Sequence, residues 1–368
     1  MIPRMRPDKS LRAQSLARRW GLTPAGAYGL AAIRYPDRAA IIDERGALTF
    51  AEVHSRTDAL ARALRASAID DRDTVAIMCR NHRGFIEATV ACSKLGANIV
   101  YLDPAAAPSV IAKVIDREDP STLIYDEEFS ELLRPVGYGR QRLVAWRDAD
   151  RHCRCAQLDE LIAREGSVTL RPPDEGRGST VMLAAPGPGT GEAGRRLPSS
   201  LEIRGAVLSR IPLRRREVTM IAAPMFRTWG FLHLILGLRL ASTLVLIRNF
   251  DPHDVLATAD EHGVTALAVL PEMLASIMEL PEATTACYRN EALRVVAVPG
   301  RGLASDLAIP AMERFGDVLY NLHGICTVRL ADRWTRKAWR AGDPARLGGL
   351  PLGGGASGEY AAHRVPQA

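Results

Sequence analysis

The chain has 368 residues, of which 47% are hydrophobic and 24% charged, so it can bury a large core and is not expected to be disordered. Aromatic residues make up only 5%, which argues against a platform that stacks the bases of single-stranded nucleic acid. The formal net charge of +6 favours anionic ligands, but the dense arginine runs at 195–196 and 214–216 are too short to indicate nucleic-acid binding.

The N-terminal stretch is basic and polar, and no apolar window reaches the length of a membrane span. These features predict a cytoplasmic protein without a transmembrane segment. The 6 cysteines lack the spacing of a disulfide framework and fit reduced thiols in that compartment. Cys153 and Cys155 follow His152, but no second ligand pair lies nearby at zinc-finger spacing, so we predict no metal site there.

Strand and helix patterns alternate through the first third of the chain. The predicted elements are a hairpin of 39–43 and 47–50, helices at 51–66, 85–95 and 108–118, and strands at 73–78, 98–102 and 121–125. This alternation predicts an α/β fold with a parallel, doubly wound layer and helices on its faces. From 134 to 178 the periodicity is lost, and we expect an irregular connection with one helix at 158–164.

The alternation resumes in the second half of the chain. The predicted elements there are strands at 218–223, 242–247, 264–269, 293–298 and 318–322, and helices at 232–240, 251–262 and 307–315. Asp251 is expected to cap the second of these helices. Periodicity fades beyond Asp332, and the sequence is rich in glycine from Gly348.

Residues 184–196 form a stretch with four glycines that follows an apolar run and opens into a segment with helical potential. Glycines let a backbone come close to a ligand, and amides that point outward from such a turn can hold phosphate. The same composition is also typical of a flexible surface loop, and the stretch alone does not decide between the two.

The order of elements and several short motifs resemble the adenylate-forming superfamily, and most closely bacterial fatty-acyl-CoA synthetases. The motifs are spread along the chain: 36–41, 48–53, 80–85, 94–97, 221–226, 295–297 and 315–321. The resemblance implies the large N-terminal domain of that fold at 31–353, preceded by an extension at 1–30 and followed by a tail at 354–368. In this family an acid and ATP form an acyl-adenylate, and coenzyme A then takes the acyl group, with Mg²⁺ as cofactor.

The glycine-rich stretch occupies the place of the family's phosphate loop, which resembles Thr-Ser-Gly-Thr-Thr-Gly-x-Pro-Lys-Gly. Ala184, Ala185 and Pro188 stand where the family has residues with hydroxyl groups that donate hydrogen bonds, and Glu192 stands at the lysine position. A carboxylate there repels polyphosphate, although Arg195 and Arg196 follow it. The resemblance implies remnant nucleotide contacts, which we expect at Gly187, Gly189, Thr190, Arg195, Gly302, His323 and Gly324.

A second motif resembles Pro-x-Phe-His-x-x-Gly and begins at Pro224. Arg227 takes the histidine position, where it is a permanent cation that can contact a carboxylate but cannot titrate. The resemblance implies acyl-chain contacts at Arg227, Trp229, Gly230 and Phe231. The alternative is that the aromatic side chains belong to the core.

A third motif resembles Tyr-Gly-x-Thr-Glu and begins at His323. Thr327 replaces the glutamate that binds Mg²⁺ in the family, and Cys326 precedes it. No counterpart is found for the family's ribose-binding aspartate, hinge or small C-terminal domain with its lysine. Asp343 lies before Pro344, in the context of an earlier loop, and we do not assign it as the ribose ligand.

Three hypotheses follow from these substitutions. The first choice is an acid–CoA ligase-like protein that is catalytically impaired but retains acyl-chain or nucleotide binding. The alternatives are a working fatty-acid-activating enzyme that uses ATP, Mg²⁺ and CoA, and a non-catalytic scaffold or product of a decaying gene. Only another polypeptide could supply the missing cap.

Overall fold

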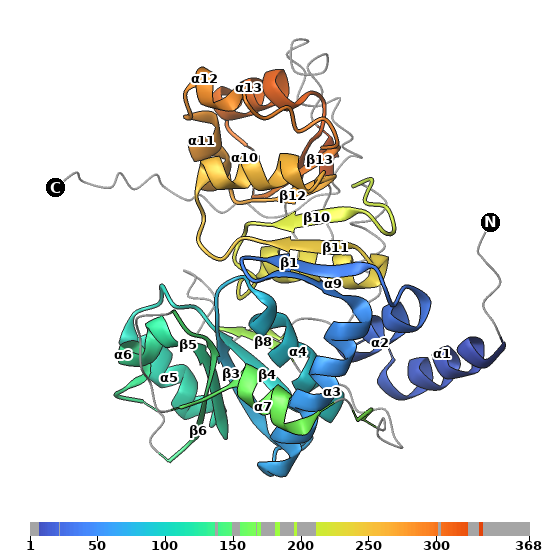
Figure 1. Ribbon diagram of the computed structural model, residues 1–368. Helices are drawn as coiled ribbons and strands as arrows, with labels where there is room; N and C mark the ends of the chain where they lie inside the picture. Colours follow the sequence, from blue (N-terminus) through green and yellow to red (C-terminus); the bar gives the residue numbers. More distant parts are fainter. Residues whose placement is uncertain are drawn as a thin grey trace, which may run out of the picture.

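The computed structural model describes residues 7–21, 23–136, 139–148, 155–166, 168–170, 181–184, 195–196, 211–300, 303–322 and 331–333. Its strands form two sheets (Figure 1). Sheet A has the order β15-β14-β13-β12-β10-β11-β1-β2, and sheet B the order β7-β6-β5-β3-β4-β8-β9. Neighbouring strands are parallel except for the pairs β1–β2, β14–β15 and β8–β9. The predicted α/β class with mostly parallel sheets is therefore confirmed.

Sheet A combines the N-terminal hairpin with the second half of the chain. Its strands are β1 (Ala39–Asp43), β2 (Gly46–Thr49), β10 (Val218–Ile221), β11 (Thr243–Leu246), β12 (Ala266–Ala268), β13 (Val295–Pro299), β14 (Leu319–Leu322) and β15 (Ala331–Arg333). Helices of the second half follow these strands: α9 (Thr228–Leu240), α10 (Pro252–Glu261), α11 (Pro271–Met278), α12 (Glu282–Thr285) and α13 (Ser305–Phe315). Helices α10, α11 and α13 share an apolar cluster with sheet A.

Sheet B is built from the first half of the chain. Its strands are β3 (Thr74–Met78), β4 (Asn98–Leu102), β5 (Thr122–Asp126), β6 (Gln141–Trp146), β7 (Ala156–Gln157), β8 (Val181–Ala184) and β9 (Arg195–Arg196). Its helices are α3 (Phe50–Ala66), α4 (Arg83–Leu95), α5 (Pro108–Glu118), η1 (Glu127–Phe129), α6 (Ser130–Leu133) and α7 (Leu158–Glu165). Helices α5 and α6 cover the face of sheet B that points away from sheet A (Figure 1).

Helix ends follow local sequence signals. Thr49 and Glu52 form a capping box at the start of α3, in which the Glu52 N–H donates to Thr49 Oγ1 over 3.2 Å and the Thr49 N–H to Glu52 Oε2 over 2.7 Å. Helix α4 ends at Gly96, whose φ of 79° suits a residue without Cβ. Asp251 caps α10 as expected.

Two helices precede the first strand, α1 (Pro7–Trp20) and α2 (Pro24–Arg34), so α2 crosses the boundary expected at residue 31. Helix α2 joins α3, α4, α7 and α9 in one apolar cluster between the sheets, which includes Tyr28, Phe85 and Phe231. None of the described helices is long and apolar enough to cross a membrane.

The connection expected to be irregular at 134–178 needs a correction. It contains the predicted helix, as α7, but also strand β6, which pairs in parallel with β5. Residues 143–146 of β6 are buried, yet a short apolar run beside arginines carries a weak strand signal. Partner strands, rather than local preference, fix this segment in the sheet.

Candidate active site

The carboxyl ends of parallel strands from both sheets meet at one junction, where ligands bind in open α/β sheets. Asn81, just after β3, joins the two sheets. Its Nδ2 donates to the carbonyls of Ile221 at 3.0 Å and Ala223 at 2.9 Å, and its Oδ1 accepts from the Met225 N–H at 2.8 Å. Asn81 is buried, so these bonds fix the end of β10 against the end of β3.

Arg227 and Asp103 form an ion pair across this junction. Arg227 Nε lies 2.9 Å from Asp103 Oδ2, where Arg227 precedes α9 and Asp103 follows β4. The Asp103 side chain is only 3% exposed, whereas that of Arg227 is 43% exposed. The buried carboxylate therefore orients a guanidinium whose other N–H groups can reach an anion.

The glycine-rich stretch begins beside this pair. Ala184, the last residue of β8, lies opposite Leu102 in the parallel ladder, and Asp103 comes next along the chain. Arg195 pairs with Leu183 in the antiparallel strand β9, so the stretch connects two strands of a hairpin. The segment with helical potential that follows this stretch lies outside the described residues.

Three predicted acyl-contact residues lie in the first turn of α9, which begins four residues before the predicted helix. Trp229 is buried and donates from Nε1 to the Val269 carbonyl at 3.1 Å, and its ring packs edge-on against His233. Phe231 packs against Tyr101, with ring centroids 5.2 Å apart. A Cβ on Gly230 would lie 2.3 Å from the Pro224 carbonyl oxygen, so only glycine permits this approach.

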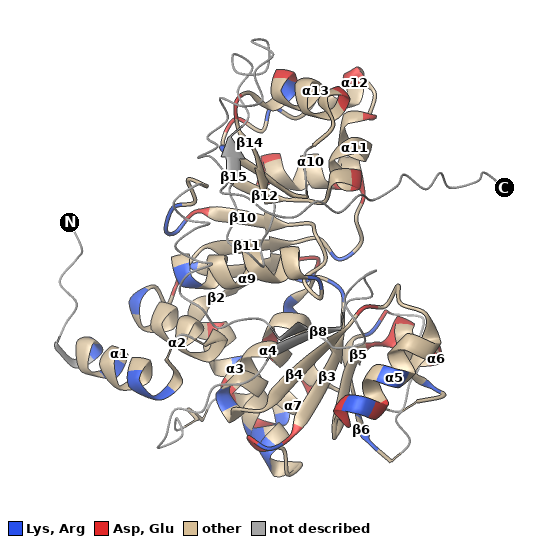
Figure 2. Ribbon diagram, turned by 180° about the vertical axis from the view of Figure 1, so that it is seen from behind, with Lys and Arg blue, Asp and Glu red and all other residues tan. Residues whose placement is uncertain are grey.

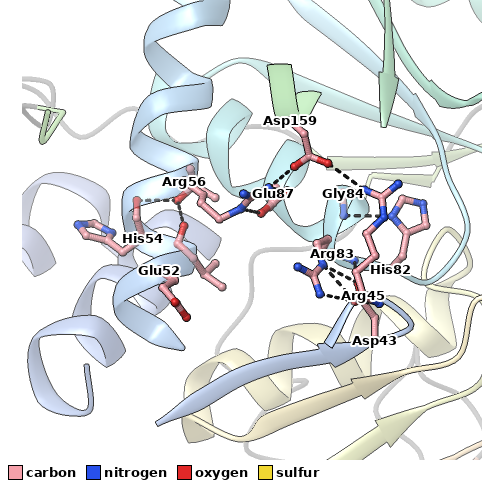
Figure 3. A network of polar contacts seen from close by, with 12 residues as sticks. Asp43, Arg45, Glu52, His54, Arg56, His82, Arg83, Gly84, Glu87 and Asp159 are labelled. Atoms are coloured by element: carbon pink, nitrogen blue, oxygen red, sulfur yellow. Dashed lines mark hydrogen bonds and ion pairs between the residues drawn. The ribbon is translucent and has the colours of Figure 1, made fainter. Parts of the chain in front are cut away.

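A network of charged groups holds sheet A against the helices of sheet B (Figure 3). Arg83 at the start of α4 donates through Nε to both carboxylate oxygens of Asp43 at 3.0 Å, and its backbone N–H donates to the same group. Burial alone would raise the pKa of Asp43, but the hydrogen bonds and charge of Arg83 outweigh it and lower that pKa. Arg56 pairs with Glu87 and with Asp159, so α3, α4 and α7 are linked as well.

Cys79, His82 and Asp126 form a buried cluster that sequence reasoning did not identify. His82 Nδ1 accepts the Gly84 N–H at 3.0 Å, so its Nε2 carries the proton and donates to Asp126 Oδ1 at 2.8 Å. Neither ring nitrogen has a lone pair left for a metal ion. Within the cluster, His82 serves as the N-terminal cap of α4, and Asp126 holds its ring.

Most of the predicted nucleotide contacts lie outside the described residues. These are Gly187, Gly189, Thr190, Gly302, His323 and Gly324, together with Glu192, Cys326, Thr327 and the rejected Asp343. Arg195 is described only as a backbone position of β9. The structure brings Arg227, Trp229, Gly230 and Phe231 into one segment beside the strand ends. Asp103 and Asn81 were not assigned to the site, although a polar residue directly after a buried strand is the signal that could have found Asp103.

Comparison with known proteins agrees with this architecture. The chain matches the AMP-binding enzyme family over residues 30–177 and 201–341. It is 26% identical to 4-coumarate–CoA ligase 5 of Oryza sativa subsp. japonica over 65% of this chain and 45% of that protein. It is 24% identical to a long-chain-fatty-acid–CoA ligase of Thermus thermophilus over 73% of this chain and 50% of that protein.

The fold also matches the crystal structure of the anthranilate CoA ligase AuaEII in complex with anthranoyl-AMP. The TM-score is 0.76 at 17% identity, over 87% of this chain and 63% of that one. The chain thus spans about half the length of the curated relatives it matches. Because the family match covers well over half of its residues, the chain belongs to the AMP-binding enzyme family.

Proposed function

We propose that the chain binds an organic acid at the junction of the two sheets and is impaired in activating it with ATP. The observation that carries this proposal is Arg227, a 43% exposed cation held in place by buried Asp103 at the ends of the strands. A guanidinium in a fixed orientation is well suited to receive a carboxylate in a bidentate contact. For the acid, we propose a fatty acid whose chain extends beside Trp229 and Phe231.

The impairment rests on the phosphate loop and the metal position. Activation requires the acid oxygen to attack the α-phosphorus while pyrophosphate leaves, and cations must stabilise the charge that develops. Glu192 stands where the family has lysine, so it adds like-charge repulsion of polyphosphate where a cation would attract it. Cys326 and Thr327 do not fit Mg²⁺, which prefers carboxylate oxygen.

The acid-binding part is tested by calorimetric titration of the chain with decanoate. We expect saturable binding that Arg227→Gln weakens about tenfold, because a charged hydrogen bond is lost, and that Arg227→Lys weakens less. Arg65→Gln, an exposed arginine at the end of α3, is the matched control and leaves the affinity unchanged. Equal affinity in the wild type and in Arg227→Gln would contradict the assignment of Arg227.

The assignment of the loops is tested by restoring the family's charges. We expect Glu192→Lys combined with Thr327→Glu to raise the affinity for ATP in the presence of Mg²⁺. A folded double variant with unchanged ATP affinity would show that these positions do not face the nucleotide.

The second candidate is an active acid–CoA ligase. Arg195 and Arg196 favour it, because two cations directly follow the phosphate loop and could partly replace the lysine. Its acid could be aromatic, as in the rice relative, or aliphatic, as in the Thermus relative. Acid-dependent formation of acyl-adenylate would establish this candidate.

A further inference from the structure

A small pocket lies between α2 and α9, at the opposite end of α9 from Arg227. Its volume is about 110 Å³, and it is lined at its apolar wall by Ala27, Leu30, Ala31 and Leu238. An apolar cavity of about 150 Å³ holds one benzene ring, so this pocket suits a short chain of a few carbons. At 1.5 Å per residue, the start and end of α9 are about 18 Å apart, which separates the pocket from Arg227.

Three arginines from three segments complete the lining. They are Arg34 in the last turn of α2, Arg239 in the last turn of α9, and Arg215 in the segment before β10. No acidic residue is among the described residues that line the pocket. In Figure 2, Lys and Arg are coloured blue, and blue segments gather where α2 and α9 end near the segment before β10.

Capping of the helix ends does not account for these arginines. The Tyr35 N–H donates to the Ala31 carbonyl at 2.7 Å, the Ser242 N–H to the Gly237 carbonyl at 2.9 Å, and the Arg216 N–H to the Leu240 carbonyl at 2.9 Å. These backbone groups already satisfy carbonyls of the last turns. Among the residues that the structure describes, no carboxylate forms an ion pair with Arg34 or Arg215, and both side chains are exposed.

We propose that this pocket binds a small amphiphilic anion, a short-chain monocarboxylate whose carbon chain fills the apolar wall and whose carboxylate meets Arg34 and Arg215. The apolar wall supplies burial of the chain, and the guanidinium groups select the negative charge. The site is separate from the junction of the sheets and does not depend on the proposed function.

The experiment titrates hexanoate into the Arg227→Gln variant, in which binding at the junction is weakened about tenfold. We expect saturable binding of hexanoate. Hexanol and inorganic phosphate should bind at least about tenfold more weakly, because hexanol lacks the negative charge and phosphate lacks the carbon chain. Arg34→Gln and Arg215→Gln, each added to this background, weaken hexanoate about tenfold, whereas Arg65→Gln does not. Ala27→Phe fills the pocket and abolishes binding, with folding checked by circular dichroism.

Several outcomes would overturn the proposal. They are the absence of saturable hexanoate binding, equal affinity for hexanol or phosphate, and an undiminished affinity in folded Arg34→Gln or Ala27→Phe. A decanoate affinity about tenfold lower in Arg227→Gln, with hexanoate binding retained, would support both sites. If decanoate does not bind even the wild type but hexanoate binds as described, the proposed function fails and the pocket stands.

Discussion

Two histidines, the partly buried His54 and the buried His233, remain neutral at pH 7 in the folded chain. Burial lowers the pKa of His54 to about 4, and the charge of Lys94 adds to this effect while Asp58 opposes it. Burial alone lowers the pKa of His233 to about 4. Neither ring nitrogen of His233 has a hydrogen-bond partner among the described residues, which places an unsatisfied polar group in an apolar cluster.

We predict that acid destabilises the chain through these two residues. An unfolded histidine has a pKa of about 6.5, so between pH 6.5 and 4 the unfolded state binds more protons than the folded state. The free energy of unfolding therefore falls as the pH decreases through this window. Urea unfolding at pH 7, 6 and 5 measures this fall, and equal stability at pH 7 and 5 would contradict the lowered pKa of the two rings.

His233→Leu separates the two contributions. We expect it to raise stability at pH 7 by about 1 kcal/mol, because an unsatisfied polar group is replaced by an apolar one, and to reduce the loss toward pH 5. Leu236→Met, a buried neighbour in α9, is the control that changes packing without changing titration. If His233→Leu leaves the pH dependence of stability unchanged, groups other than His233 cause the loss of stability in acid.

Of the individual residues at the candidate site, the sequence indicated only some. Arg227 was identified from a motif, because the replaced histidine stood in a recognisable frame. Its partner Asp103 comes from a strand 124 positions away in the chain, and such a pairing exists only once the two sheets meet. The neutral state of His233 likewise depends on burial, which no local pattern reveals.

Helix α9 is the element that connects these features. It carries Arg227 at its start, His233 in its middle and Arg239 at its end, and it packs with sheet A and α2. The predicted helix began four residues late, because Thr228, Trp229 and Gly230 are weak helix formers. Tertiary contacts fix the start of α9, since Gly230 packs against the Ala223 and Pro224 carbonyls where no side chain fits.

We predict that Gly230→Ala destabilises the chain by about 1–3 kcal/mol and weakens decanoate binding, because α9 must shift away from the end of β10. Gly237→Ala is the matched control in the same helix, since its Cβ would meet only the Leu244 side chain, whose nearest atom can move. Urea unfolding and the decanoate titration measure both effects. Similar losses in the two variants would contradict the special role of Gly230.

The strands of the sheets show the same division between local and tertiary signals. Buried strands such as β3, β4 and β12 were predicted because short apolar runs bounded by turns are typical of parallel sheets. Strand β6 was missed because Arg142 and Gln141 interrupt its pattern, and β9 because two arginines carry no strand signal of their own. Both pair with a neighbour whose position the sequence alone does not give.

For the whole molecule, two sheets with helices between them place Arg227, the proposed acid contact, and the pocket at opposite ends of one helix. The family match and the fold establish the AMP-binding scaffold, whereas Glu192 and Thr327 depart from the family's charges. The activity of such a scaffold depends on the residues at its site, so the fold alone does not establish activity. The central claim is that this chain binds an acid that it does not efficiently activate.

Acid-dependent exchange of pyrophosphate into ATP tests this claim most directly, because it reports the first half-reaction alone. We predict that decanoate with ATP and Mg²⁺ gives no exchange above the level without acid, in a preparation whose decanoate binding has been confirmed by titration. Exchange that rises with decanoate and saturates would contradict the account and establish an active acid-activating enzyme.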